Sequence, residues 1–232
     1  MTIESEIRAY LGVAGEHPRY RSWEHCYGYF QRTTPGGLTA DRDQAALQLG
    51  FYLASWGMYR GSSFLLQHAY TVHLGVVDVL AEERFQDLWA CDVGARAANT
   101  GLRPLVWELV LGIREAYLPF APAAGSTQPT DTLVTKVILG TVGCLPACDR
   151  YFIDGFKSAG HKFSYLNPAF IERMFGFCQA NLSALTTEQS RIARDGGVFY
   201  PLMKLADMYF WQLGLDREME AASHLSAHRT AD

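Results

Sequence analysis

The sequence lacks the features that mark several specialised classes of protein. Five cysteines in 232 residues are too few, and odd in number, for a scaffold held by disulfides, so we expect reduced thiols. No uninterrupted apolar run reaches the ~18 residues that a membrane helix needs. The opening residues MTIESEIRAY contain two glutamates and no apolar segment of the kind found in secretory signals. We therefore expect a cytoplasmic protein with no membrane segment.

A strong charge of either sign is also missing. The chain has 20 Lys and Arg against 24 Asp and Glu, a net charge of −4 that is spread evenly along it. A protein that coats nucleic acid needs a strong basic field, so a nucleic-acid partner is disfavoured, although the charge alone does not exclude one. Hydrophobic residues make up 49% of the chain, which is enough to build a globular core. Most of the basic residues are arginines and the chain is rich in Ala and Gly, a bias common in bacterial genomes of high GC content.

Signals for β-strands are scarce, whereas helix starts and stops recur throughout. The best strand candidate, 135–142, has no partner elsewhere in the chain, and an isolated strand leaves its backbone groups unpaired. Pro104 suits the first turn of a helix that Pro119 ends, and Asn167-Pro168 opens another. These patterns predict an all-α protein.

We expect a single multi-helix domain over 1–215, followed by a polar and partly frayed tail at 216–232. The only linker-like stretch is 119–130, which is rich in Pro, Ala, Gly, Ser and Thr. It could separate two domains, but neither half clearly has the composition of a self-sufficient domain. We therefore interpret it as a long surface loop.

The most informative pattern is a long absence of charge. Between Asp43 and Asp78, Arg60 is the only residue with a formal charge. A helix that faces water normally carries a charged face, so the uncharged run predicts two central apolar helices, at about 41–60 and 63–80. Arg60 would lie at their junction.

Two interpretations of Arg60 follow, because a buried guanidinium must be paired on most of its donors. In the structural interpretation it pairs with a carboxylate such as Glu24 or Asp149. In the functional interpretation it binds an anion, because Gly61 permits a turn and the next helix begins with free N–H groups. The side chains that we expect to line such a ligand-binding pocket are Arg60, Ser62, Ser63, His68, His73 and Asp149.

A segment in the second half of the chain carries two resemblances. The pattern K-x-x-L-G-x-x-G-x-x-P-A-x-D-R-Y-F at 136–152 resembles a segment of uncharacterised bacterial helical proteins, and this resemblance implies no activity. The part at 139–147 also resembles the hairpin of helix-hairpin-helix modules, whose backbone N–H groups hold a DNA phosphate. Val142, Gly143 and Ala147 match that motif, while Thr141 stands where its first glycine belongs, and the hairpin contains no Lys or Arg.

No metal or cofactor site is predicted. His68, His73 and Asp78 are five residues apart, and one helix cannot direct all three at a single ion. The leading hypothesis is a helical protein whose polar pocket binds a small anionic or phosphate-bearing ligand, and the sequence leaves open whether chemistry follows. The alternatives are a DNA-binding or DNA-processing protein of the helix-hairpin-helix type and a protein-interaction or scaffold domain. A homo-oligomer is compatible with each of them.

Overall fold

The structure, a computed structural model, describes residues 2–16, 21–33, 35–89, 91–121, 129–195 and 199–229. These residues form α-helices, short 3-10 helices and connecting turns, with no β-strand among them, so the predicted all-α class is confirmed. Buried side chains from both sides of the 119–130 stretch belong to one hydrophobic core. Among the described helices, none combines the length and apolar character that crossing a membrane would require.

The α-helices are α1 (Ile3–Glu16), α2 (Ser22–Arg32), α3 (Pro35–Ala40), α4 (Arg42–Ser55), α5 (Leu74–Leu80), α6 (Gln86–Trp89), α7 (Leu102–Tyr117), α8 (Asp131–Thr141), α9 (Arg150–Ser158), α10 (Pro168–Ala180), α11 (Leu182–Arg194) and α12 (Leu202–Arg229). The 3-10 helices are η2 (Phe64–Gln67), η3 (Tyr70–His73), η4 (Glu83–Phe85) and η5 (Leu118–Phe120).

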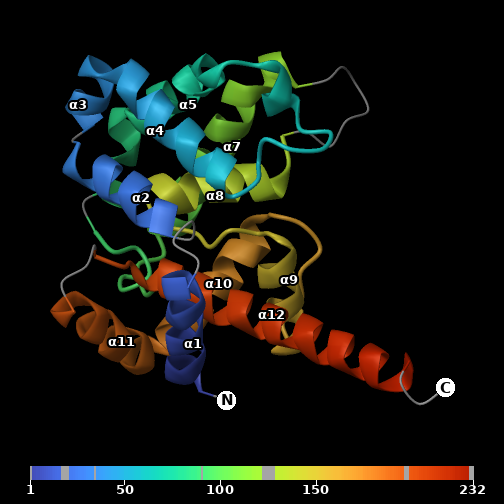
Figure 1. The fold of residues 1–232 in the computed structure, drawn as a ribbon. Helices are drawn as coiled ribbons and strands as arrows, with labels where there is room; N and C mark the ends of the chain where they lie inside the picture. Colours follow the sequence, from blue (N-terminus) through green and yellow to red (C-terminus); the bar gives the residue numbers. More distant parts are fainter. Residues whose placement is uncertain are drawn as a thin grey trace.

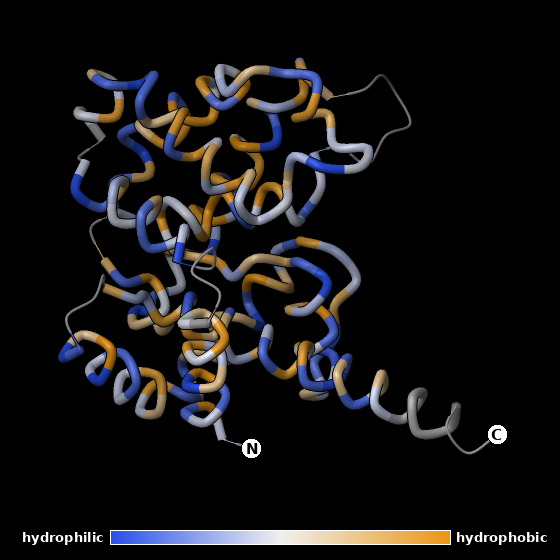
Figure 2. The backbone as a smooth tube through the Cα atoms, in the orientation of Figure 1, coloured by the Kyte–Doolittle hydropathy of each residue, from blue (hydrophilic) through white to orange (hydrophobic). Residues whose placement is uncertain are grey.

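The helices form two groups, with α8 on the side of the first group that faces the second (Figure 1), and α7 contacts α10 across the boundary. One group contains α2–α5 and α7, and the other contains α1 and α9–α12. Residues 133–141 of α8 are all buried, because this helix packs against α2, α4 and α7. Many of the hydrophobic residues lie inside the two groups, where helices face one another (Figure 2). α12 extends away from the body of the molecule towards the C-terminus (Figure 1). The chain crosses from the first group to the second at the turn between α8 and α9.

Two glycines allow α9 and α12 to cross at very short range. A Cβ atom at Gly155 would lie 1.8 Å from the backbone oxygen of Phe210, and one at Gly214 would lie 2.0 Å from the backbone oxygen of Tyr151. Only a residue without a side chain fits at such distances. The crossing places the first turn of α9 beside the middle of α12, where Tyr151 and Trp211 pack edge to face with ring centroids 5.1 Å apart.

The prediction of two long central apolar helices needs correction. The first helix is α4, which ends at Ser55, and its outer face exposes Leu47 and Phe51 to solvent. The expected helix at 63–80 is wrong in its first half, since η2, an extended step at His68 and Ala69, and η3 precede the short α5. Tertiary contacts outweigh the helical pattern here, because η3 packs on α4 and directs the Tyr70 hydroxyl to the carboxylate of Asp43.

The expected tail and loop also differ from the structure. α12 continues without a break from the core through the predicted tail to Arg229. Its residues 217–223 are solvent-exposed and helical, as expected for a polar segment that is carried on a helix with a buried first half. In the predicted loop, η5 occupies 118–120 and Thr130 caps α8, whereas 122–128 lie outside the described residues.

Candidate functional site

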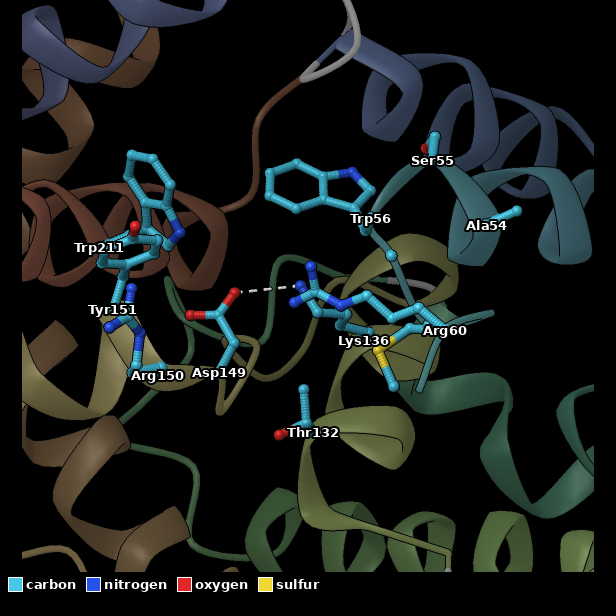
Figure 3. A pocket seen from close by; sticks show the side chains of 12 residues that line it. Ala54, Ser55, Trp56, Arg60, Thr132, Lys136, Asp149, Arg150, Tyr151 and Trp211 are labelled. Carbon is cyan, nitrogen blue, oxygen red and sulfur yellow. Dashed lines mark hydrogen bonds and ion pairs between the residues drawn. The ribbon is translucent and has the colours of Figure 1, made fainter. Parts of the chain in front are cut away.

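A cavity of about 650 Å³ opens where the two groups of helices meet (Figure 3). The end of α4 and the turn after it form one side, α8 supplies a second, and the start of α9 together with α12 supplies a third. The lining residues are Ala54, Ser55, Trp56, Gly57, Met58, Arg60, Thr132, Lys136, Asp149, Arg150, Tyr151 and Trp211. The cavity therefore combines three cationic side chains, one carboxylate and three aromatic rings.

Lys136 and Asp149 form an ion pair in the wall of this cavity. The Lys136 ammonium lies 3.0 Å from the Asp149 carboxylate and 4.6 Å from the centre of the Trp56 ring. The lysine side chain is only 4% exposed, and that of the aspartate is 18% exposed. Such a buried ammonium needs a counter-charge, which Asp149 supplies, and the face of the indole adds a cation–π contact.

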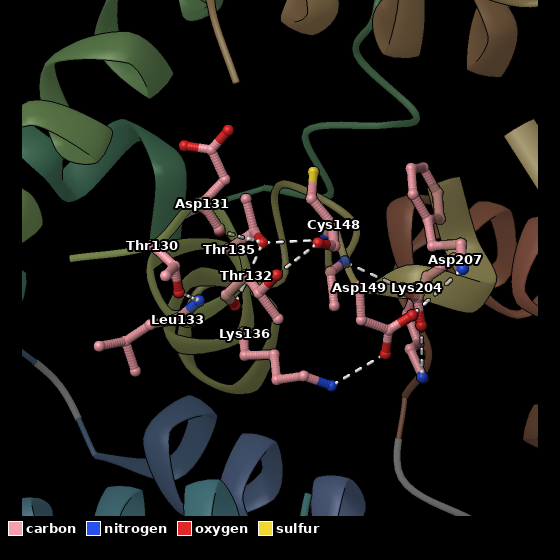
Figure 4. Close-up of polar contacts among 12 residues, drawn as sticks. Thr130, Asp131, Thr132, Leu133, Thr135, Lys136, Cys148, Asp149, Lys204 and Asp207 are labelled. Carbon is pink, nitrogen blue, oxygen red and sulfur yellow. Dashed lines mark hydrogen bonds and ion pairs between the residues drawn. The ribbon is translucent and has the colours of Figure 1, made fainter. Parts of the chain in front are cut away.

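The turn that carries Asp149 is held in place from several directions (Figure 4). The same carboxylate accepts a hydrogen bond of 3.1 Å from the Phe152 N–H, so Asp149 is the N-cap of α9. The Thr135 hydroxyl accepts the Cys148 N–H at 2.8 Å, and the Thr132 hydroxyl donates to the Cys148 carbonyl at 2.7 Å. One aspartate therefore starts the helix and neutralises the lysine, which gives the carboxylate little freedom to reorient.

A second lysine–aspartate pair lies behind the cavity. The Lys204 ammonium is 2.8 Å from the Asp207 carboxylate, which accepts the Ala147 N–H at 2.9 Å. A small void beside this pair shares four lining residues with the cavity: Trp56, Lys136, Asp149 and Trp211. The second pair thus lies behind these indoles and contacts the turn before Asp149 rather than the cavity.

Arg60 lies on the turn after α4, and its side chain is solvent-exposed while lining the cavity. It folds back over Gly57, where a Cβ atom would lie 3.2 Å from the arginine Nε. The predicted pairing with Glu24 or Asp149 is absent, because Glu24 binds Arg21 and the Tyr200 hydroxyl. Among the described residues the guanidinium has no hydrogen-bond or ion-pair partner.

Arg150 is the third cation of the lining, and its charge is neutralised from outside the cavity. The guanidinium lies 2.7 Å from the carboxylate of Glu218 on α12 and 4.6 Å from the centre of the Tyr151 ring. Glu218 balances Arg150 and Asp149 balances Lys136, whereas Arg60 has no counter-charge. The cavity therefore has an excess of one positive charge at Arg60.

The structure divides the six predicted pocket residues into two sets. Arg60 and Asp149 line one cavity although 89 positions separate them in the sequence. Ser62, Ser63, His68 and His73 are not among the lining residues. The Ser63 hydroxyl caps η2 by accepting the Leu65 N–H, and the His68 ring packs edge to face on Phe64 and Phe120.

His73 is buried in a different place, between two tyrosines. Its Nε2 lies 2.7 Å from the Tyr59 hydroxyl, and its Nδ1 lies 2.7 Å from the Tyr117 hydroxyl. Burial lowers the pKa of the His73 imidazole to about 4, so the ring is neutral near pH 7.

Sequence reasoning missed Lys136 and the aromatic residues Trp56, Tyr151 and Trp211. Lys136 had a signal of the kind that identified Arg60, since it is a single charge in the apolar run LVTKVIL. The tryptophans had no such signal, because aromatic residues at helical spacing are most often core residues.

The turn that resembles a helix-hairpin-helix motif joins α8 to α9, but residues 142–148 are buried. The Gly143 N–H donates to the Ile138 carbonyl, and the Ala147 and Cys148 N–H groups donate to Asp207 and Thr135. A DNA phosphate would need these donors to be free. The geometry therefore gives the DNA-binding interpretation no support.

The described residues contain no group of three or more His, Cys, Asp or Glu side chains placed to hold a metal ion. All five cysteines are free thiols, and four of them are buried. No protein-family model, no curated protein and no solved structure matches the chain. The function must therefore be inferred from the geometry and charge of the cavity.

Proposed function

We propose that the cavity binds a small organic anion through a phosphate or carboxylate group. One observation carries the proposal: among the charged residues that line the cavity, Arg60 alone has no partner in the described part of the chain. A guanidinium presents a planar fork of donors that matches carboxylate and phosphate oxygens. Its position on a cavity wall means that an anion bound there would also contact the other lining residues.

The surroundings of Arg60 favour the same class of ligand. The Lys136 ammonium, which is paired with Asp149, adds a hydrogen-bond donor to the lining in a site with little exposure to water, where charge interactions are stronger than in bulk solvent. A volume of about 650 Å³ is within the range of small-molecule pockets.

The aromatic rings indicate that the ligand has an apolar part as well. Trp56, Tyr151 and Trp211 contribute rings to the lining, and such surfaces contact the organic portion of a ligand while a few polar groups orient it. Inorganic phosphate should therefore bind more weakly than an organic phosphate of similar charge. Adenosine monophosphate is a suitable probe because it joins a phosphate to a flat ring system.

A thermal-shift experiment tests the proposal. Wild-type protein should show a saturable rise in melting temperature with adenosine monophosphate, because a ligand that binds only the folded state stabilises it. Arg60→Ala should keep the melting temperature of the free protein, since the exposed guanidinium has no partner to lose, but should lose the ligand-induced rise. Arg32 at the end of α2 is also exposed and lies outside the cavity lining, so Arg32→Ala is the matched control.

Two results of the thermal-shift experiment would contradict the proposal. If neither inorganic phosphate nor adenosine monophosphate nor a tricarboxylate such as citrate shifts the melting temperature of the wild-type protein, the cavity is not an anion site. A shift that Arg60→Ala and Arg32→Ala reduce equally would mean a diffuse effect of charge, which likewise contradicts a site at Arg60.

A further inference from the structure

The turn that carries Arg60 is bounded by two glycines in a left-handed conformation. Gly57 has φ of 72° and Gly61 has φ of 59°, values that side-chain-bearing residues rarely adopt. Between them, Met58, Tyr59 and Arg60 form a short segment. Its Met58 N–H donates to the Leu53 carbonyl and its Arg60 carbonyl accepts the Ser63 N–H. These backbone hydrogen bonds hold the two ends of the segment, but they do not fix the positions of its side chains.

A single side-chain hydrogen bond connects this segment to the core. Among the side chains of residues 57–61, only the Tyr59 hydroxyl makes a hydrogen bond within the described structure, and its partner is the His73 Nε2 at 2.7 Å. His73 is fully buried, and its Nδ1 reaches the Tyr117 hydroxyl on α7. The residue next to Arg60 is therefore tied to a fixed point of the core.

The protonation states of His73 and the two tyrosines determine which group donates each hydrogen bond. Burial keeps His73 neutral, so one ring nitrogen donates and the other accepts, and one tyrosine hydroxyl must donate to the ring while the other accepts from it. Burial also raises the pKa of Tyr59 to about 12 and raises that of Tyr117, so both hydroxyls stay protonated near pH 7. Gly50 leaves room for the ring, because a Cβ atom there would lie 3.3 Å from its Cδ2.

We propose that Tyr59 is a positioning residue for anion binding, which holds Arg60 at the cavity by hydrogen-bonding the buried His73. This inference rests on the proposed function, because it matters only if Arg60 binds the ligand. The physical reason is preorganisation: a segment bounded by two glycines has many accessible conformations, and a ligand must otherwise restrict them when it binds.

The chain offers a matched pair of variants, since Tyr59→Phe and Tyr117→Phe each remove one hydrogen bond from the same imidazole. The affinity for adenosine monophosphate, measured by titration calorimetry, should fall by about 3- to 10-fold in Tyr59→Phe. Tyr117→Phe should bind within about 2-fold of the wild type, because Tyr59 keeps its bond to His73. The melting temperature should fall in both variants, which separates the effect on binding from the effect on stability.

The same titrations distinguish failure of this inference from failure of the proposed function. If the wild-type protein binds neither the nucleotide nor phosphate, the proposed function is wrong and the inference falls with it. If the wild type binds and the two variants bind equally, whether both match the wild type or both are weakened, the inference alone is wrong.

A second variant keeps the inference testable should Tyr59→Phe not fold. Gly57→Ala leaves the tyrosine and the histidine unchanged but places a Cβ atom where Arg60 folds back, at a strained φ. It should weaken binding by about 3-fold or more, because it displaces the same guanidinium. Unchanged affinity in Gly57→Ala would contradict the claim that the position of Arg60 is held by this turn.

Discussion

The two lysine–aspartate pairs have nearly the same chemistry and different surroundings. Lys136–Asp149 spans 3.0 Å and Lys204–Asp207 spans 2.8 Å, and both lysines are almost fully buried. The first pair lines a cavity large enough for a ligand. The second contacts Tyr10 and the turn backbone at Ala147, and the space it borders is a void of about 10 Å³ that both pairs line.

The difference shows that an ion pair alone does not identify a functional site. Each pair satisfies its own charges, and each helps to fix the turn before α9. What distinguishes them is the open space beside Lys136 and the unpaired guanidinium of Arg60 across it. Substitutions in and around the two pairs should therefore differ in their effects on stability and on ligand affinity.

Asp207→Ala should have the largest effect on stability. It leaves the Lys204 ammonium without a counter-charge and the Ala147 N–H without an acceptor, at a site where the two side chains of the pair are only 2% and 6% exposed. Loss of one partner of a buried pair typically costs about 3–5 kcal/mol of the free energy of unfolding, which urea denaturation measures. A cost below about 1 kcal/mol would mean that the second pair is not structural.

His73, which anchors the Arg60 turn, predicts a dependence of stability on pH. The pKa of His73 is about 4 in the folded protein, below its ordinary value of 6.5, because burial disfavours the charged form. The unfolded chain thus binds a proton that the folded protein excludes, so the stabilisation is complete above pH 6.5 and is lost as the pH falls towards 4. We expect the unfolding free energy to drop by about 3 kcal/mol over that window.

His73→Asn should reduce the change in unfolding free energy with pH, because asparagine does not titrate. The two proteins are compared by urea unfolding at pH 7 and pH 5. His25→Asn is the control, because the His25 side chain is exposed to solvent. If the unfolding free energy changed equally with pH in the wild type and in His73→Asn, the pH dependence would come from other groups.

Lys136→Met tests the other side of the comparison. It retains most of the side-chain volume but leaves the Asp149 carboxylate uncompensated at the edge of the cavity, where solvent partly screens it. The expected stability cost is about 1–2 kcal/mol, smaller than for Asp207→Ala. The affinity for adenosine monophosphate should fall by about 10-fold or more, because a cation is removed and an unpaired anion remains.

An intact affinity in Lys136→Met, measured by the same titration calorimetry, would show that the ligand does not enter the part of the cavity near α8. Arg60 would then act alone at the surface, and the two ion pairs would have the same structural role.

Ser62→Ala should have the smallest effect. Ser62 is exposed and lies outside the cavity lining, although the sequence pattern placed it in the pocket. Stability should stay within about 0.5 kcal/mol of the wild type and nucleotide affinity should not change. A marked loss of affinity in this variant would mean that the ligand contacts the turn beyond Gly61 and that the site extends further than the cavity.

The sequence predicted the helical class correctly because helix starts, stops and spacing are local signals. Asn167, where the sequence predicted a helix start, caps α10 in the structure, and caps of this type can be recognised from a few residues. The helix expected at 63–80 failed because contacts with α4, remote in sequence from η3, determine the conformation there.

The candidate site was predictable only in part. The absence of charge at 44–77 identified Arg60, and its side chain does line a cavity with Asp149. Arg60 itself is exposed, because the chain turns back to the surface at Gly57, and α4 exposes Phe51 instead of a charged face. Ser62 and His73 were placed by proximity in sequence, which says little about proximity in space once the helix is broken.

The most direct test of the central claim is the NMR signal of the Arg60 Nε–H, assigned by comparison with Arg60→Lys and followed while adenosine monophosphate is added. If the cavity binds the anion at Arg60, this signal should move saturably, with the same affinity that calorimetry gives, while the Arg32 signal stays in place. A saturable movement at other arginines with none at Arg60, or equal and unsaturable movement at Arg60 and Arg32, would contradict the account.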